Sequence, residues 1–194
     1  MLAKQSIPGS SLILAMLFAA AAGAQTPQPR RAPDVPYVPT TEEAVQAMLK
    51  LADVKKTDIV YDLGCGDGRI VIAAAKTYGA HGVGIDINPV RIAEAKENAK
   101  TAGVEGLVRF EENDLFKADI HEASVVTLFL LSSVNLQLRP KLLQDLKPGT
   151  RIVSNTFDMG DWKAEKEVTV GSQDDDAFLS RHLFLWTVPP HDPK

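Results

Sequence analysis

A short apolar run leads directly into a glycine-rich loop in the first half of the chain. Residues 59–63 read Ile-Val-Tyr-Asp-Leu, residues 64–68 read Gly-Cys-Gly-Asp-Gly, and a run of aliphatic and small residues follows from Arg69. Glycines at this spacing let the backbone turn sharply and let a ligand approach it closely. The pattern therefore predicts a strand, a tight turn that forms a ligand site, and a helix.

Helical and strand-like patterns alternate after this point, which predicts a parallel α/β sheet. Two last apolar runs, 164–170 and 180–188, flank a turn-like segment and predict an antiparallel pair at the sheet edge. Thr40 and Glu43 fit a capping box for a first helix. The other expected helices are 69–78, 89–102 (capped by Asn88) and 140–146, and the other expected strands are 59–63, 82–86, 108–111, 125–130 and 151–155.

The loop carries carboxylates where a dinucleotide site would hold pyrophosphate. Asp62 lies just before the loop and Asp67 lies within it, and the spacing is G-x-G-x-G rather than G-x-G-x-x-G. Two like charges about 4 Å apart repel by roughly 4 kcal/mol at an effective dielectric of about 20, or about a thousandfold in affinity. S-adenosylmethionine has no phosphate and carries an ammonium and a sulfonium. The charges therefore favour this methyl donor over NAD.

Acidic residues also follow the next two expected strands. Asp86 ends the strand 82–86, and Asp114 comes shortly after the strand 108–111. Because the carboxyl ends of parallel strands share one edge of a sheet, we expect both acids to lie near the loop. Asp86 is suited to accept the two ribose hydroxyls, and Asp114 to accept the adenine amino group. Leu115 offers apolar surface to the adenine ring.

Three segments, 62–69, 84–86 and 113–115, resemble the signature segments of class I S-adenosylmethionine-dependent methyltransferases. The resemblance covers roughly residues 36 to 188. It implies a Rossmann-like methyltransferase fold: a seven-stranded, mostly parallel sheet with an antiparallel C-terminal strand pair and helices on both faces. Within this class the chain is most similar to small protein-lysine methyltransferases of archaeal and mitochondrial type. The segments that carry this likeness are 36–40, 126–131, 138–143, 146–151 and 157–162.

The resemblance also implies which residues contact the cofactor. Tyr37 and Thr40 would close over its amino-acid end, with a plain helix cap as the alternative role of Thr40. The full set that the resemblance assigns to S-adenosylmethionine is Tyr37, Thr40, Asp62, Gly64, Gly66, Asp67, Asp86, Ile87, Asn113, Asp114 and Leu115.

The methyl acceptor is less constrained than the cofactor. Base and glutamine-amide methyltransferases carry an Asn/Asp-Pro-Pro-aromatic segment after the fourth strand, where this chain reads Leu-Leu-Ser-Ser at residues 130–133. That difference argues against a nucleobase or an amide nitrogen as the acceptor, and the resemblance implies a protein lysine instead. Tyr37, Asp158 and Trp162 are the candidate catalytic residues, unless Trp162 packs on the sheet edge and Asp158 caps a turn. A small-molecule methyltransferase and a non-catalytic cofactor-binding module stay open as alternatives.

Composition limits the partners. The formal net charge is −4 and the pI is about 5.6, which disfavours a nucleic-acid partner. The four histidines are far apart, so no metal site is expected.

The first 24 residues are typical of a leader rather than of a fold. Lys4 precedes an apolar run from residue 11 to 22, and Ala-Gly-Ala at 22–24 fits a signal-peptidase site. A proline-rich linker (25–39), a methyltransferase domain (40–188) and a short tail (189–194) follow. A cleaved leader would export the protein to the periplasm, although S-adenosylmethionine is made in the cytosol. The alternative is an uncleaved anchor in the inner membrane.

Overall fold

The computed structural model describes residues 32–171 and 181–190. The predicted leader, the first part of the linker and the end of the tail lie outside these residues. Within the described ranges, no helix is both long enough and apolar enough to cross a membrane.

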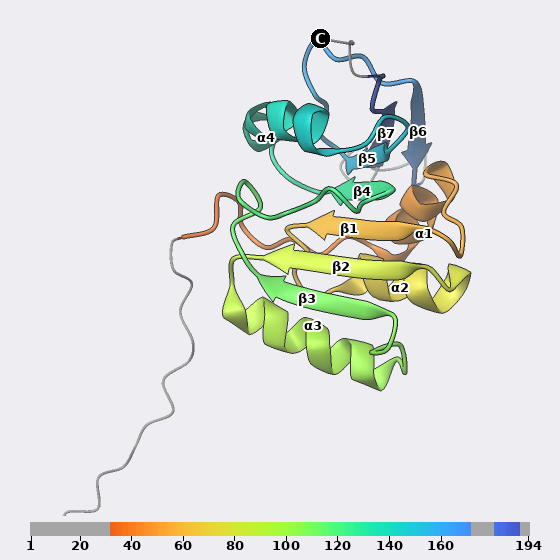
Figure 1. The fold of residues 1–194 in the computed structure, drawn as a ribbon, viewed down its shortest axis with the longest axis vertical. Coiled ribbons are helices and arrows are strands. Elements are labelled where there is room, and N and C mark those ends of the chain that lie inside the picture. The colour runs from red at the N-terminus through yellow and green to blue at the C-terminus, as the bar shows by residue number, and fades with distance from the viewer. Residues whose placement is uncertain (1–31, 172–180, 191–194) are drawn as a thin grey trace, which may run out of the picture.

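The centre of the molecule is one sheet of seven strands in the order β3-β2-β1-β4-β5-β7-β6 (Figure 1). Its first five members in this order are parallel, and β7 runs antiparallel to both β5 and β6. The fold class predicted from the sequence is therefore confirmed. The strands are β1 (Ile59–Leu63), β2 (His81–Asp86), β3 (Val108–Glu112), β4 (Val125–Leu128), β5 (Arg151–Asn155), β6 (Lys166–Val170) and β7 (Arg181–Thr187).

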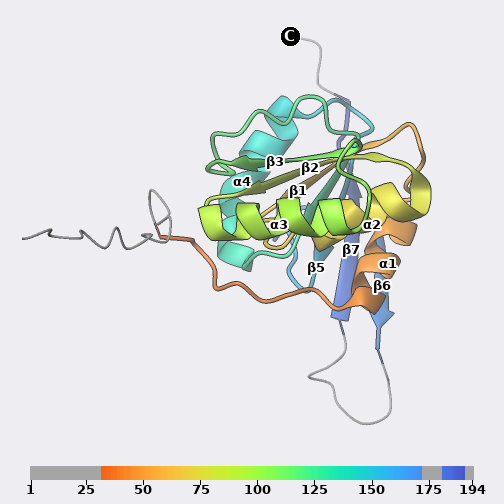
Figure 2. The ribbon, with the colours of Figure 1, turned by 90° about the horizontal axis from the view of Figure 1, so that it is seen from below.

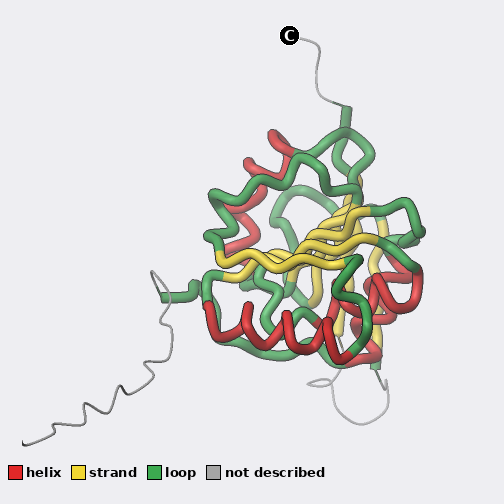
Figure 3. The backbone as a smooth tube through the Cα atoms, turned by 60° about the horizontal axis from the view of Figure 1, so that its bottom comes forward, coloured by secondary structure: helices red, strands yellow, loops and turns green. Residues whose placement is uncertain are grey.

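Helices cover both faces of the sheet, as Figures 2 and 3 show. One face packs on α1, α2 and α3, and the other packs on α4. Side chains alternate between the faces along each strand, so that Val60 of β1 joins the first core while Tyr61 and Leu63 join the second. The helices are α1 (Glu42–Leu51), α2 (Arg69–Tyr78), α3 (Pro89–Thr101) and α4 (Ser132–Asp145).

The structure corrects the start of two helices. Thr41, not Thr40, is the cap of α1, and its hydroxyl accepts a hydrogen bond from the Ala44 amide. The expected helix 140–146 is the second half of α4, which begins eight residues earlier. Pro140 removes only one hydrogen bond of that helix, and the carbonyl it leaves belongs to exposed Leu136, where water can reach it.

A buried ion pair ties the amino ends of three strands together. One carboxylate oxygen of Asp58, just before β1, lies 2.5 Å from the Arg151 guanidinium of β5 and accepts the Ser124 hydroxyl at 2.7 Å. Its other oxygen accepts the Lys55 amide at 2.6 Å. Arg151 also donates to the Ala52 carbonyl at the end of α1. The pair therefore fixes α1 and the β4–β5 half of the sheet to β1.

We expect Asp58→Ala to lower the free energy of unfolding by about 3–5 kcal/mol, because it leaves the Arg151 charge partly buried without its partner. Urea unfolding followed by circular dichroism measures the loss. The exposed ion pair of Asp119 with His121 supplies the control, and Asp119→Asn should leave the midpoint unchanged. Equal midpoints for Asp58→Ala and the unaltered protein would contradict the expectation.

Candidate functional site

The glycine loop between β1 and α2 has the backbone geometry that its glycines allow. Gly64, Gly66 and Gly68 all have positive φ, at 86°, 52° and 79°. The Gly64 and Cys65 amides donate to the Ile85 carbonyl of β2 at 2.8 and 2.9 Å. The pairing of β1 with β2 ends at these hydrogen bonds, and the turn of the glycine loop begins there. A side chain at Gly64 would start 3.0 Å from Leu130. The loop thus brings bare backbone to the carboxyl edge of the sheet, as predicted.

Asp62 is a buried carboxyl at this edge. It is 3% exposed and accepts the Thr127 hydroxyl of β4 at 2.8 Å. Burial raises the pKa of Asp62 to about 7, and the nearby charges of Asp86 and Asp67 add to the rise. Near neutral pH the Asp62 carboxyl is therefore only partly ionised, and a bound cation would favour its ionised form.

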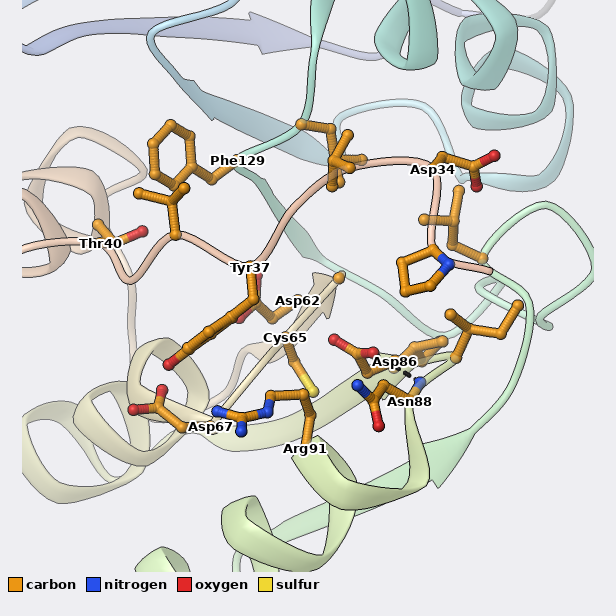
Figure 4. Close-up of a pocket in the computed structure, with 18 of the residues that line it drawn as sticks. Asp34, Tyr37, Thr40, Asp62, Cys65, Asp67, Asp86, Asn88, Arg91 and Phe129 are labelled. Carbon is orange, nitrogen blue, oxygen red and sulfur yellow. Dashed lines mark hydrogen bonds between the residues drawn. The ribbon is translucent and has the colours of Figure 1, made fainter. Parts of the chain in front are cut away.

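Asp86, the last residue of β2, connects two turns. One carboxylate oxygen accepts the Gly66 amide at 2.9 Å. The other accepts the Asn88 amide at 2.8 Å, as Figure 4 shows. Asn88 in turn caps α3 through its side chain, as the sequence predicts. The carboxylate of Asp86 therefore has a fixed orientation and keeps lone pairs for a ligand.

Asp67 is already paired within the chain. Its two oxygens accept from Nε and Nη2 of Arg69 at 2.9 and 2.6 Å, and Arg69 also donates to the Thr40 carbonyl at 2.7 Å. Partial burial acts to raise the pKa of Asp67, but the Arg69 guanidinium outweighs it and lowers that pKa. The order of residues along the chain predicts Asp62 and Asp67 as equivalent acids beside the ligand. In the structure, Arg69 neutralises Asp67.

Residues 33–40, here called the strap, lie along the mouth of this site without helix or strand structure. The Tyr37 ring covers Gly66, where a Cβ atom would lie 2.3 Å from the ring, and the Arg91 guanidinium stacks on it at 4.6 Å. Partial burial and the charge of Asp67 raise the pKa of Tyr37. Thr40, at the end of the strap, is buried. The strap belongs to the segment predicted as a proline-rich linker.

The strap, the loop and the strand ends enclose a cavity of about 400 Å³, a size typical of small-molecule sites (Figure 4). Gly66 and Asp114 are not among its lining residues. Gly66 acts through its bond to Asp86, and the Asp114 carboxylate accepts the Phe116 amide and so caps a turn. The predicted residues that line the cavity are Tyr37, Thr40, Asp62, Gly64, Asp67, Asp86, Ile87, Asn113 and Leu115.

Two candidate catalytic residues lie outside the cavity. The Asp158 carboxylate is exposed and accepts the Gly160 amide at 3.1 Å, so it caps a turn. Trp162 packs on Trp186 with ring centroids 6.1 Å apart, and its carbonyl accepts the Trp186 indole N–H. Both residues thus have the structural roles that the sequence left open. Tyr37 is the one candidate of the three that lines the cavity.

Part of the cavity wall was not predicted from the sequence. Phe129, Leu130 and Val134 form an apolar side after β4, and Arg91 reaches in from α3. The only feature of the sequence that could have indicated these residues as part of the wall is their position after a buried strand.

Burial raises the pKa of the Cys65 thiol well above its usual value, so this cysteine stays protonated. Among residues 32–171 and 181–190, no cluster of His, Cys, Asp and Glu side chains is suited to hold a metal ion.

The family model of the ANTKMT methyltransferase domain matches residues 62–166, more than half of the chain. A protein-lysine N-methyltransferase of Saccharolobus islandicus is 46% identical over 160 residues, which cover 82% of this chain and 97% of that protein. The chain belongs to this methyltransferase family. The adenine nucleotide translocase lysine N-methyltransferase of Mus musculus is 34% identical over 146 residues, which cover 74% of this chain and 63% of that longer protein.

Solved structures agree with this assignment and show the cofactor. A Salinibacter ruber protein described as an RNA methyltransferase is 52% identical, with a TM-score of 0.73 and coverage of 81% of this chain and 97% of that one. A methyltransferase of Thiobacillus denitrificans is 26% identical, with a TM-score of 0.54 and coverage of 59% and 48%. Both hold S-adenosyl-L-homocysteine, which is S-adenosylmethionine without its methyl group. This methyltransferase therefore uses S-adenosylmethionine, and the buried Asp62 carboxyl beside the loop suits a cationic ligand without phosphate.

We expect S-adenosylmethionine to bind more tightly as pH rises, because Asp62 attracts a cation only when it is ionised. With a pKa of about 7 for Asp62, affinity should rise about eightfold between roughly pH 6.0 and 7.5, a range below the usual pKa of an α-amino group. Calorimetric titration measures this slope. Asp62→Asn should bind more weakly at pH 7.5 and lose the slope, and a variant that kept the slope would contradict the assignment.

Proposed function

We propose that this methyltransferase transfers a methyl group to the side-chain amine of a lysine in a protein. The observation that carries the proposal is the 46% identity to the protein-lysine N-methyltransferase of Saccharolobus islandicus across 97% of that protein. The proposal also rests on the cavity wall, because an apolar side made by Phe129, Leu130 and Val134 suits a neutral alkyl amine better than a polar base.

We also propose how the cavity divides the cofactor. The fixed carboxylate of Asp86 would accept the ribose hydroxyls, and Ile87, Asn113 and Leu115, which line the cavity, would surround the adenine. Asp62 lies where it can attract the ammonium, and Tyr37 closes over that end from the strap.

The acceptor amine must be neutral to react. S-adenosylmethionine supplies a methyl group on a positively charged sulfur, and displacement needs the amine lone pair in line with it. A free lysine has a pKa near 10.4, and desolvation favours its neutral form. The apolar wall supplies that desolvation.

A nucleobase acceptor would need residues after β4 that orient an amide group. Leu131 and Ser132 occupy that place in this chain, and neither carries a carboxamide.

RNA is the competing acceptor, because the similar Salinibacter ruber protein is described as an RNA methyltransferase. The charges favour protein instead. Arg69 and Arg91 border the cavity, and each pairs with a carboxylate at 2.6 Å, Asp67 and Glu94 respectively. With a net charge of −4, the chain lacks the basic balance typical of RNA-binding proteins.

A transfer assay with radiolabelled S-adenosylmethionine tests the proposal against total cell protein, total RNA and small-molecule extract. We expect label in protein, at methyllysine identified by mass spectrometry. Asp86→Ala should weaken cofactor binding at least about tenfold, because a hydrogen bond to a charged group contributes roughly 1.5–3 kcal/mol. Asp119→Asn, which changes an exposed acid, serves as the control. Label confined to RNA or to small molecules would overturn the lysine proposal.

We propose further that the leader is a cleaved secretory signal, on the basis of its apolar run and the Ala-Gly-Ala sequence at 22–24. Mass spectrometry of the protein isolated from its native host should find an N-terminus at Gln25. An intact Met1 in the membrane fraction would support the anchor instead.

A further inference from the structure

Five large apolar side chains are exposed among the described residues, and four of them belong to the strap or to the start of α4. Tyr37 and Val38 belong to the strap, and Leu131 and Leu136 belong to the start of α4. We call these four residues the apolar rim. The fifth large exposed apolar residue, Val168, lies on the edge strand β6. Single exposed apolar residues are ordinary, whereas a group of them beside a site marks a binding surface.

The rim is continuous with the cavity. Tyr37 and Val38 line the cavity themselves. Leu131 follows Leu130, which lines the cavity, and is the cap residue of α4. The rim residues are 41–52% exposed, so about half of each side chain is free to be covered.

The loop after β5 extends this surface. Leu136 packs over Gly160, where a Cβ atom would lie 2.8 Å from its side chain. The same loop carries Phe157, whose ring stacks on Phe129 of the cavity wall with centroids 6.3 Å apart. Asn135 of α4 donates to the Phe157 carbonyl and holds the loop against the helix. Packing and a hydrogen bond thus link the start of α4, the loop and the cavity wall.

Charges near this surface favour a cation among apolar neighbours. Asp34 of the strap is exposed and lines the cavity, and Asp158 is exposed on the loop. The nearby cations Arg91 and Arg139 are paired with Glu94 and Asp161. One further cation, Arg181, lies over the Phe129 ring at 6.0 Å.

We propose that the apolar rim docks the acceptor protein through a segment in which the target lysine is flanked by apolar residues. This inference deepens the proposed lysine methyltransferase activity and rests on it. The apolar flanks cover Val38, Leu131 and Leu136, while the lysine passes between the strap and α4 into the cavity. The exposed carboxylate of Asp158 on the loop attracts the lysine before the apolar wall desolvates it.

Two peptides test the docking. Each carries one lysine at the centre of twelve residues and an N-terminal fluorophore, with leucine and alanine as flanks in one and serine and glycine in the other. Fluorescence anisotropy in the presence of S-adenosylhomocysteine measures binding, and methyl transfer gives KM and kcat. The apolar peptide should bind at least about tenfold more tightly, as expected if about two leucines are covered.

Variants locate the binding surface. The double variant Leu131→Ser with Leu136→Ser should raise the Kd and KM of the apolar peptide about tenfold, and Leu131→Ser alone should raise them several-fold. The kcat should stay unchanged, because these contacts stabilise the bound peptide and the transition state equally. Val168→Ser is the matched control, because Val168 is equally exposed but lies on β6. Unchanged cofactor affinity by calorimetry shows that each variant is folded.

The outcomes separate the docking from the activity. The docking is supported if the apolar peptide binds tightly and the rim variants weaken that binding. This result would hold even if no methyl group were transferred and the lysine proposal failed. Equal binding of the two peptides, or rim variants that behave like Val168→Ser, would overturn the docking while leaving lysine methylation intact. Binding of labelled RNA that the rim variants abolish would also overturn it.

Discussion

The hydrogen bonds to one carboxylate organise the site of this methyltransferase. Asp86 accepts the Gly66 amide from the glycine loop and the Asn88 amide from the start of α3, so both turns keep their positions relative to β2. The loop can take this shape because Gly64 and Gly66 adopt positive φ. The cavity, the position of Tyr37 over Gly66 and the fixed orientation of Asp86 all follow from this arrangement.

The distribution of charge around the loop is more specific than a simple excess of acids. Asp67 and Arg69 neutralise each other and link the loop to the strap at Thr40, whereas Asp62 is buried and has a pKa of about 7. The site therefore presents the Asp86 carboxylate in a fixed orientation and, in Asp62, a carboxyl whose charge depends on pH. Such a site repels phosphate and accommodates the positive charge of S-adenosylmethionine.

The order of the elements could be predicted because each depends on local pattern. Five parallel strands, the Asn88 cap and the antiparallel pair at the edge are all where periodicity and turn residues indicate. The cap of α1 and the start of α4 could not be predicted. Thr40 and Thr41 are both able to cap a helix, and the choice depends on burial of Thr40 behind Arg69. Packing of α4 on the sheet overrides Pro140.

The sequence by itself determined the fold class, the cofactor and nine residues of its cavity, because strand ends, glycines and acids follow from their order along the chain. Only the tertiary structure decided which acids are available and which apolar residues surround the mouth. Asp67 is paired, Asp158 and Trp162 lie outside the cavity, and Val38 lines the same cavity as Val134 of α4 although 96 positions separate them. Pairing, burial and proximity depend on contacts between distant segments, and no local pattern in a single sequence specifies them.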